Sequence, residues 1–117
     1  MVVDDDKSMV NMIKDVLEME GYAVTTAFDG EQALKQVQKQ SDIILLDINL
    51  PKMDGFSICK EVRRYSDVPI MFITARVNEE DVLNGYALGC DDYIIKPFAL
   101  PVLFEKVKAL IKRSKGL

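Results

Sequence analysis

The sequence of 117 residues contains no histidine and no tryptophan. Without an imidazole, the chain cannot supply a histidine base, nucleophile or metal ligand, which excludes the serine–histidine–aspartate type of hydrolase. Any chemistry that it performs must therefore use carboxylates, hydroxyls, lysine amines and backbone groups.

Cysteine is also scarce, because Cys59 and Cys90 are the only two and they do not form a C-x-x-C motif. This pattern indicates buried, reduced thiols rather than the disulfide framework of a secreted protein. No apolar run approaches the roughly 18 residues that a membrane span needs, and no signal peptide is visible. We therefore expect a cytoplasmic protein with no membrane partner.

Basic residues are in the minority, with 15 lysine and arginine side chains against 19 acidic ones and a net charge of −4. This balance disfavours nucleic acid and anionic membranes as direct ligands, because both are polyanions. The length fits a single domain, and an apolar share of 49% is enough to build its core.

Two kinds of segment alternate along the chain. Short apolar runs rich in β-branched residues predict strands at residues 2–3, 22–26, 43–46, 70–73 and 93–95. The alternation with helical segments predicts an α/β domain with a five-stranded, doubly wound parallel sheet. The helical segments are indicated by apolar residues at helical spacing: Met9, Ile13, Val16 and Leu17; Ala33, Leu34 and Val37; Phe56, Cys59 and Val62; Leu83, Tyr86 and Ala87; Leu103, Val107, Leu110 and Ile111.

Residues at the expected helix ends support this assignment of helices and strands. Gly21 and Gly89 follow two of the predicted helices, and glycine is the commonest residue just beyond a helix. Asp29 with Gln32 three residues later resembles a capping box, and Asn78 is suited to cap the fourth helix.

Residues with reactive or metal-binding groups follow four of the five predicted strands. In open parallel sheets, ligands bind beyond the carboxyl ends of the strands, so these side chains should meet. They are Asp4, Asp5 and Asp6 after the first strand, Asp47 after the third, Thr74 at the end of the fourth and Lys96 after the fifth.

Carboxylates that lie this close together repel one another unless a cation binds between them. Mg²⁺ suits this cluster, because it binds one or two carboxylates, keeps several waters and leaves positions for phosphate oxygens. Thr74 and Lys96 would bind the remaining oxygens of a phosphoryl group, and a carboxylate nucleophile would form an aspartyl phosphate. Asp6 is interpreted as a solvated charge, and the Asp54-Gly55 pair as a turn and helix start.

Four motifs together resemble the receiver domain of two-component response regulators, of the OmpR/PhoB-like subfamily. The resemblance extends from Val2 to about Arg113 and implies a flavodoxin-like (βα)5 fold with strand order 2-1-3-4-5. The motifs are Val3-Asp4-Asp5, Leu46-Asp47 through Pro51-x-Met53-Asp54-Gly55, Thr74-Ala75-Arg76, and Asp91-Asp92-Tyr93-x-x-Lys96-Pro97-Phe98.

The resemblance implies a role for each residue of the expected site. Asp47 is expected to be the phosphoacceptor, with Thr74 and Lys96 binding phosphoryl oxygens, and Thr74 and Tyr93 acting as switch residues. Mg²⁺, for which Mn²⁺ or Ca²⁺ can substitute, is expected on Asp5, Asp47 and the backbone carbonyl of Asn49. Asp4 would bind the ion through a water molecule. The family also implies a cis Lys96-Pro97 peptide and a role for Asn49 and Arg76 in tuning the lifetime of the phosphoryl group.

The implied function is a signalling switch rather than an enzyme with turnover. The domain would accept a phosphoryl group from the phosphohistidine of a sensor histidine kinase. Phosphorylation would then shift the face formed by the fourth helix, fifth strand and fifth helix, and so promote a homodimer. Residues 1–113 would form the receiver domain and 114–117 would start a linker or tail, with DNA bound only by a domain absent from this chain.

The expected dimer face departs from the subfamily pattern in one respect. Asp92 and Lys106 keep a charge pair that the subfamily uses there. Val82 and Val102 stand where a basic residue and a glutamate are usual, which removes a salt bridge and favours apolar contact.

Three other functions fit the sequence less well. A phosphatase of the haloacid-dehalogenase type has its nucleophile after the first strand in a D-x-D motif, whereas Asp47 follows the third predicted strand. A flavodoxin-like cofactor carrier needs a phosphate-binding loop where three aspartates stand here. A degenerate receiver used only for protein contacts is disfavoured, because every residue of the site is present.

Overall fold

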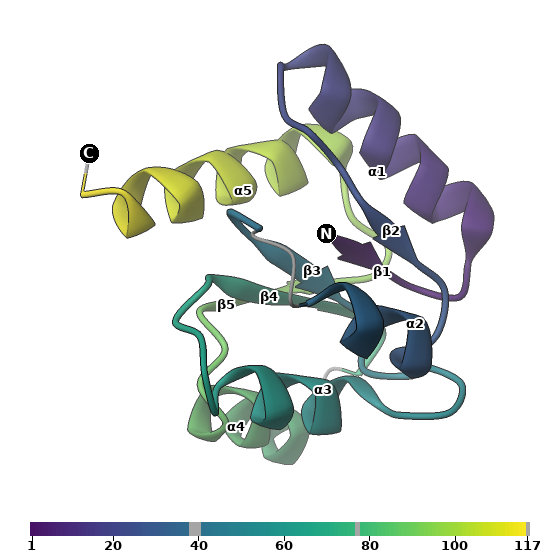
Figure 1. Cartoon of the computed structure of the whole chain (residues 1–117), viewed down its shortest axis with the longest axis vertical. Coiled ribbons are helices and arrows are strands. Elements are labelled where there is room, and N and C mark those ends of the chain that lie inside the picture. The colour runs from purple at the N-terminus through teal and green to yellow at the C-terminus, as the bar shows by residue number, and fades with distance from the viewer. Residues whose placement is uncertain (38–40, 77, 117) are drawn as a thin grey trace.

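The computed structural model describes residues 1–37, 41–76 and 78–116. Within these residues, five strands alternate with five helices along the chain (Figure 1). The strands are parallel and lie in the order β2-β1-β3-β4-β5, which confirms the predicted sheet. The elements are β1 (Val2–Val3), α1 (Lys7–Met19), β2 (Thr26–Ala27), α2 (Gly30–Gln36), β3 (Ile44–Leu46), α3 (Gly55–Val62), β4 (Ile70–Thr74), α4 (Glu79–Ala87), β5 (Asp92–Ile95) and α5 (Leu100–Ser114).

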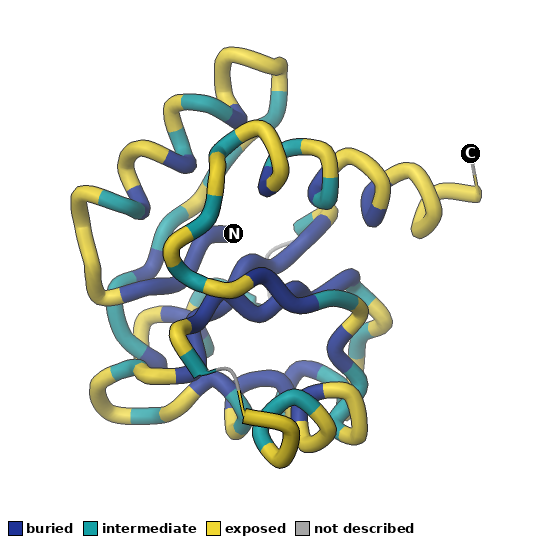
Figure 2. Tube along the Cα trace, turned by 180° about the vertical axis from the view of Figure 1, so that it is seen from behind, coloured by how far each residue is buried: buried dark blue, intermediate teal, exposed yellow. Residues whose placement is uncertain are grey.

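Helices cover both faces of the sheet, with α1 and α5 on one side and α2, α3 and α4 on the other (Figure 1). Successive strand residues point to opposite faces, so Leu45 packs with the α1–α5 core and Leu46 with the other core. Because both faces are covered, β3 and β4 are buried throughout (Figure 2). This explains why their sequences are continuously apolar.

The predicted helix caps are confirmed. The Asp29 carboxylate accepts a hydrogen bond from the Gln32 backbone N–H at 2.7 Å, and Asn78 Oδ1 accepts one from the Asp81 N–H at 2.8 Å. Gly21 and Gly89 have φ of 93° and 100°, the left-handed conformation that glycine adopts without strain just past a helix.

The two thiols are free and buried, as predicted. Burial raises the pKa of Cys90 to about 12, with further contributions from the nearby Cys59 and acidic residues. A thiol with this pKa is protonated at neutral pH and therefore a poor nucleophile.

The second strand is shorter and later than predicted. The sequence indicated residues 22–26, whereas β2 is Thr26–Ala27. Its neighbour β1 offers only Val2 and Val3 for pairing, opposite Thr26 and Ala27. Tyr22 instead donates its N–H to the Leu17 carbonyl at 3.1 Å and so completes the end of α1.

The fourth helix forms where predicted, but the residues that predicted it do not face the core. Leu83 and Tyr86 are 59% and 46% exposed, and Ala87 is exposed as well. The core side of α4 is narrow and centres on Gly85, where an added Cβ would lie 3.3 Å from the Phe72 ring. Because Gly85 and the partly buried Val82 form this narrow contact, Leu83 and Tyr86 on the other side of α4 remain in solvent.

Candidate functional site

Two of the predicted acidic residues lie side by side because their strands are neighbours. β1 and β3 pair with Val3 opposite Leu46, so Asp4 and Asp47 leave the sheet together. The Asp47 N–H donates to the Val3 carbonyl at 2.9 Å and continues this pairing. Asp4 and Asp47 are only 1% and 4% exposed, although both are acidic.

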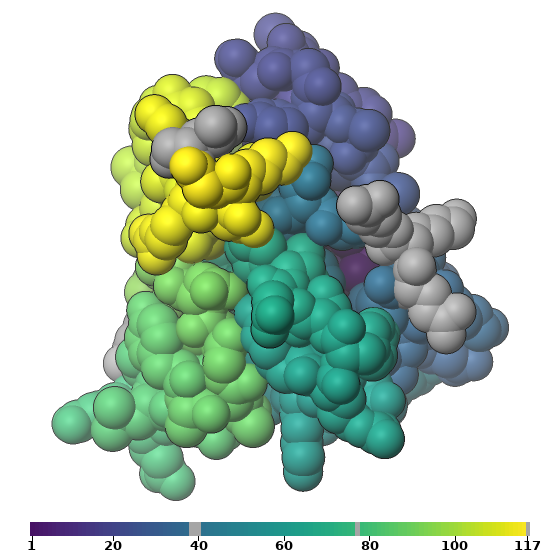
Figure 3. Space-filling model, turned by 60° about the vertical axis from the view of Figure 1, so that its left-hand side comes forward, coloured from purple at the N-terminus to yellow at the C-terminus, as the bar shows by residue number. Residues whose placement is uncertain are grey.

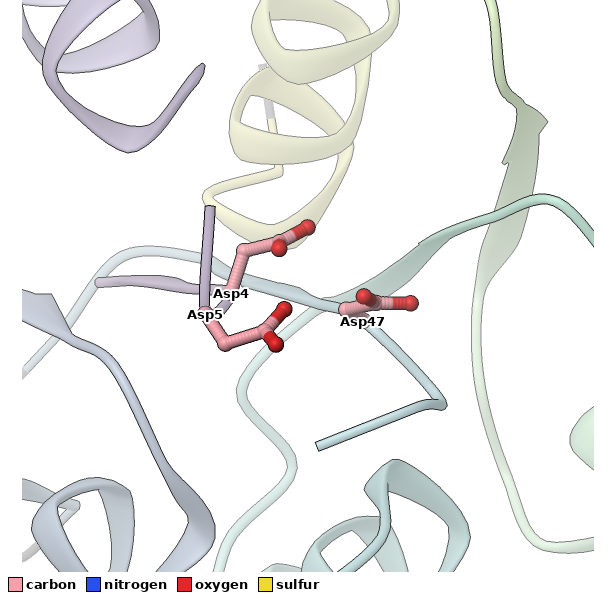
Figure 4. A group of neighbouring side chains, drawn as sticks. All are labelled: Asp4, Asp5 and Asp47. Carbon is pink, nitrogen blue, oxygen red and sulfur yellow. The ribbon is translucent and has the colours of Figure 1, made fainter. Parts of the chain in front are cut away.

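Asp5 completes an acidic cluster. One carboxylate oxygen from each of Asp4, Asp5 and Asp47 lies within 4.8 Å of the other two. Figure 4 shows Asp4 and Asp5 leaving the end of β1 and Asp47 leaving the end of β3 next to them. Two buried carboxylates and one exposed carboxylate at this spacing suit a hard divalent cation that keeps part of its water shell. The donor set therefore fits Mg²⁺.

Lys96 brings a positive charge into the same cluster from the end of β5. Its Nζ donates to Asp4 Oδ2 at 2.8 Å and to Asp47 Oδ2 at 3.2 Å. The Lys96-Pro97 peptide is cis, as the family resemblance implied. Burial acts to lower the pKa of Lys96, but the hydrogen bonds and charges of Asp4 and Asp47 outweigh it and raise that pKa overall. Lys96 is therefore a fixed cation at neutral pH.

Thr74 and Tyr93 lie on the neighbouring strands β4 and β5. Thr74 ends β4, is fully buried, and its Oγ1 accepts the Arg76 N–H at 3.2 Å. The Tyr93 hydroxyl donates to the Arg76 carbonyl at 3.2 Å, while its ring packs edge-on against Phe72. Both predicted switch residues therefore contact the backbone of Arg76.

Asn49, whose backbone carbonyl is an expected Mg²⁺ ligand, lies in the loop that follows Asp47. The Asn49 backbone N–H donates a hydrogen bond to Asp47 Oδ1, with 3.3 Å between nitrogen and oxygen. Its exposed side chain accepts two hydrogen bonds from Arg76, from Nε at 3.0 Å and from a terminal nitrogen at 2.6 Å. Sequence reasoning singled out both residues but did not predict that they bind each other.

Gly55 was interpreted only as part of a helix start, and its position beside the acidic site was missed. Asp54 does cap α3, by accepting the Ser57 N–H at 2.8 Å. The Gly55 N–H also donates to the Ile48 carbonyl at 2.8 Å. A Cβ on Gly55 would lie 2.3 Å from the carbonyl oxygen of Asp47. The Asp-Gly pair was the only sequence signal of this close approach.

The fold and the order of the motifs agree with one known protein family. Residues 1–108 match the family described as the response regulator receiver domain. The chain belongs to this family. The receiver domain identified from its motifs is thereby confirmed, and Asp47 at the end of β3 rather than β1 separates it from the phosphatase alternative.

The relatives of this receiver domain are transcriptional regulators. It is 45% identical over 116 residues to the transcriptional regulatory protein YvrH of Bacillus subtilis, which covers 97% of the chain and 49% of YvrH. It is 44% identical over 117 residues to the alkaline phosphatase synthesis transcriptional regulatory protein PhoP of the same species, covering 98% and 49% of the two chains. The receiver domain thus spans about half the length of these relatives.

Solved structures show the same fold. A CheY-like response regulator receiver domain protein from Methanospirillum hungatei superposes with a TM-score of 0.93 at 27% identity, and covers 98% of this chain and 94% of its own. Over the described part of the receiver domain, no helix has the length and apolar character needed to cross a membrane.

Proposed function

We propose that this receiver domain accepts a phosphoryl group on Asp47 from the phosphohistidine of a sensor histidine kinase, in a reaction that requires Mg²⁺. The observation that carries the proposal is the meeting of three carboxylates and the Lys96 ammonium at the carboxyl end of the sheet. One carboxylate acts as the nucleophile there, the Lys96 ammonium offsets the negative charge of the incoming phosphoryl group, and the other two carboxylates would help to hold Mg²⁺.

The proposed transfer forms a bond from an Asp47 carboxylate oxygen to phosphorus as the phosphorus–nitrogen bond of the donor breaks. Lys96 stays bound to Asp47 Oδ2 and neutralises charge that develops on the phosphoryl oxygens. Asp5, Asp47 and the Asn49 carbonyl would hold Mg²⁺, with Asp4 acting through water. The ion supplies electrostatic stabilisation of the transferring group when it is bound.

Thr74 and Tyr93 are proposed to report phosphorylation to the rest of the domain. The Thr74 hydroxyl would turn to donate to a phosphoryl oxygen, and this changes its contact with the Arg76 backbone. The Tyr93 hydroxyl donates to the carbonyl of Arg76. A shift of the Arg76 backbone would therefore move the contact between β5 and the β4–α4 loop. This is a two-state element of the kind that phosphorylation biases.

The proposed output is a homodimer through α4, β5 and α5, which form one side of the molecule (Figure 3). Exposed apolar residues occur on all three elements, namely Leu83, Tyr86, Ile95 and Val102. Within the chain, Lys106 binds Asp92 at 3.1 Å. Val82 packs partly against the core, so Val102 is the better placed of the two unusual valines for an apolar interface.

The full-length protein is proposed to be a cytoplasmic regulator of transcription that binds DNA through a separate domain. Its relatives are about twice as long as this chain and are transcriptional regulators. Residues 1–113 are proposed as the receiver domain and 114–117 as the start of a linker; α5 extends to Ser114, and residue 117 lies outside the described residues. The domain itself is proposed to act as a switch rather than as an enzyme with turnover.

Replacing Asp5 with asparagine is expected to weaken Mg²⁺ binding at least about tenfold, because it removes a charged ligand from the cluster. Titration calorimetry with Mg²⁺ measures the effect. Asp6→Asn is the matched control: Asp6 caps α1 by accepting the Met9 N–H, and asparagine caps as well as aspartate. Equal affinities of the two variants would contradict the proposed metal site.

Beryllofluoride with Mg²⁺, which mimics an aspartyl phosphate, is expected to convert the domain to a dimer. Val102→Asp should weaken this dimer at least about tenfold, because it places a charge in an apolar contact. Light scattering after gel filtration measures the mass. Met12→Asp is the control, since Met12 is 44% exposed and belongs to α1, which is not one of the three elements of the proposed face. Loss of the dimer in both variants, or in neither, would count against this interface.

A further inference from the structure

The loop that joins β3 to α3 is held together at its base and at its tip. At the base, the Gly55 N–H donates to the Ile48 carbonyl at 2.8 Å. At the tip, the Met53 N–H donates to the Pro51 carbonyl at 2.8 Å, which closes a three-residue γ-turn with Lys52 at its centre. The path of the loop between these two points is therefore restricted.

Lys52 has a backbone conformation that residues other than glycine rarely adopt. Its φ is 70°, and among the described residues it is the one non-glycine residue with a positive φ. A γ-turn with this φ is strained and persists only where the surrounding structure enforces it. The Lys52 ammonium lies 3.3 Å from Glu31 Oε2 and 3.7 Å from Asp29 Oδ2, but its side chain is 59% exposed, so these ion pairs contribute little. The turn must therefore be enforced mainly by backbone contacts.

Gly30, the first residue of α2, makes these backbone contacts. Its N–H donates to the Pro51 carbonyl at 3.2 Å, the same carbonyl that accepts the Met53 N–H. A Cβ on Gly30 would lie 2.5 Å from the carbonyl oxygen of Met53 and 2.5 Å from its Cβ. The start of α2 thus contacts the residues on both sides of Lys52, and only a residue without a side chain allows this approach.

We infer that the contact of Gly30 with the γ-turn at Lys52 positions the backbone carbonyl of Asn49, and so sets the preference of the acidic site for Mg²⁺ over Ca²⁺. The inference rests on the proposed metal site. Asn49 directly follows Ile48 at the base of the loop and lies two residues before Pro51 at its tip. Because both points are held, rotation of the Asn49 peptide is limited.

The two ions differ in how strictly they require this carbonyl to be placed. Mg²⁺ demands a near-ideal octahedral arrangement of ligands, whereas Ca²⁺ accepts six to eight oxygens in flexible geometry. The carboxylates of Asp4, Asp5 and Asp47 lie at the ends of β1 and β3, so they stay in place for both ions when the loop shifts. A shifted loop should therefore cost Mg²⁺ more affinity than Ca²⁺, whereas a general loss of stability would leave the ratio of the two affinities unchanged.

Two substitutions of Lys52 separate the backbone conformation from the charge. Lys52→Val is expected to raise the Mg²⁺ dissociation constant about three- to tenfold, because a β-branched residue disfavours a positive φ and lowers the population of the docked loop. The Ca²⁺ dissociation constant should rise about twofold at most. Lys52→Asn loses the same ammonium, but asparagine tolerates a positive φ, so both constants should stay within about twofold of wild type. Titration calorimetry with each ion, well below the melting temperature, measures them.

Gly30→Ala tests the other side of the contact. The added Cβ forces the γ-turn away from α2 and should change the two dissociation constants in the same direction as Lys52→Val. Gly85→Ala is the matched control: it also adds a methyl group to a buried glycine of a helix, but on α4, where the nearest atoms are ring carbons of Phe72. It should leave both constants unchanged. If Gly30→Ala fails to fold, the comparison of the two Lys52 variants decides, because that side chain is exposed.

The outcomes distinguish this inference from the proposed function. If the wild-type domain binds no Mg²⁺, the proposed metal site itself is wrong. If it binds Mg²⁺ but Lys52→Val has wild-type constants, or Lys52→Val and Lys52→Asn weaken binding equally, the positioning by the γ-turn is overturned. Equal losses of Mg²⁺ and Ca²⁺ affinity in Lys52→Val would overturn it as well, because they would show that the loop does not set the preference between the ions.

Discussion

Lys96→Ala is expected to slow the phosphorylation of Asp47 by acetyl phosphate at least about 100-fold, the usual effect of removing one group that stabilises a developing negative charge. Lys96 binds the carboxylate of the proposed phosphoacceptor directly, with its Nζ 3.2 Å from Asp47 Oδ2. Its pKa is raised above the ordinary value, so it is charged throughout the neutral range.

The same substitution should also change how the fold responds to Mg²⁺. Without Lys96, the buried carboxylates of Asp4 and Asp47 lose their positive partner, which destabilises the fold by about 1–3 kcal/mol once partial solvent screening is allowed for. Mg²⁺ occupies the same carboxylates, so it should raise the melting temperature of Lys96→Ala more than that of wild type.

Lys106→Ala is the matched control for Lys96→Ala. Lys106 binds Asp92 at 3.1 Å with a similar side-chain exposure, but it lies on α5 away from the acidic cluster. It should leave both the rate of phosphorylation and the response to Mg²⁺ unchanged. Wild-type rates for Lys96→Ala would show that the lysine takes no part in the transfer.

Gly55→Ala is expected to destabilise the domain by about 2 kcal/mol or more, because overpacking against backbone cannot be relieved by a rotamer change. The added Cβ would meet the Asp47 carbonyl oxygen at 2.3 Å and the Ile48 Cα at 2.8 Å. Either α3 must move outward or the backbone that carries Asp47, the proposed phosphoacceptor, must shift. Urea unfolding followed by circular dichroism measures the loss of stability.

Gly85→Ala provides the control for this prediction. It also adds a Cβ to a buried helical glycine, but the nearest atoms are ring carbons of Phe72 at 3.3 Å. Alanine is favoured over glycine inside a helix by about 1 kcal/mol, which offsets the mild contact. Gly85→Ala should therefore be close to neutral, and an equal effect of the two substitutions would contradict the proposed tight approach at Gly55.

The sheet and the acidic cluster could be predicted because they depend on local patterns. Buried parallel strands must be apolar on both faces, and the residues just beyond them meet at one edge of the sheet. Asp4, Asp47 and Lys96 were found this way, since each directly follows a strand. That these residues meet at one edge of the sheet needed no further information once the strand order was assigned from the family motifs.

The parts that could not be predicted depend on how elements pack. Periodicity marked Leu83 and Tyr86 as one face of a helix, but only the close approach of Gly85 to Phe72 determines which face is buried. Likewise, the extent of β2 depends on the two residues that β1 offers for pairing. Strand and helix patterns contain no information on these distances between elements.

The contacts of long, charged side chains also could not be predicted from the sequence. Lys96 binds Asp4 as well as Asp47, and Arg76 binds Asn49, although each pair is separated by 27 residues or more. Such contacts depend on the rotamer that a flexible side chain adopts in the folded backbone. The motifs identify these residues, but only the folded structure shows which partners they bind.

The most direct test of this account is the intact mass of the domain after incubation with acetyl phosphate and Mg²⁺. We predict the gain of one phosphoryl group, its removal by hydroxylamine as expected for an acyl phosphate, and no gain in Asp47→Asn. Equal phosphorylation of Asp47→Asn, or a modification that resists hydroxylamine, would contradict the assignment of Asp47 as the phosphoacceptor.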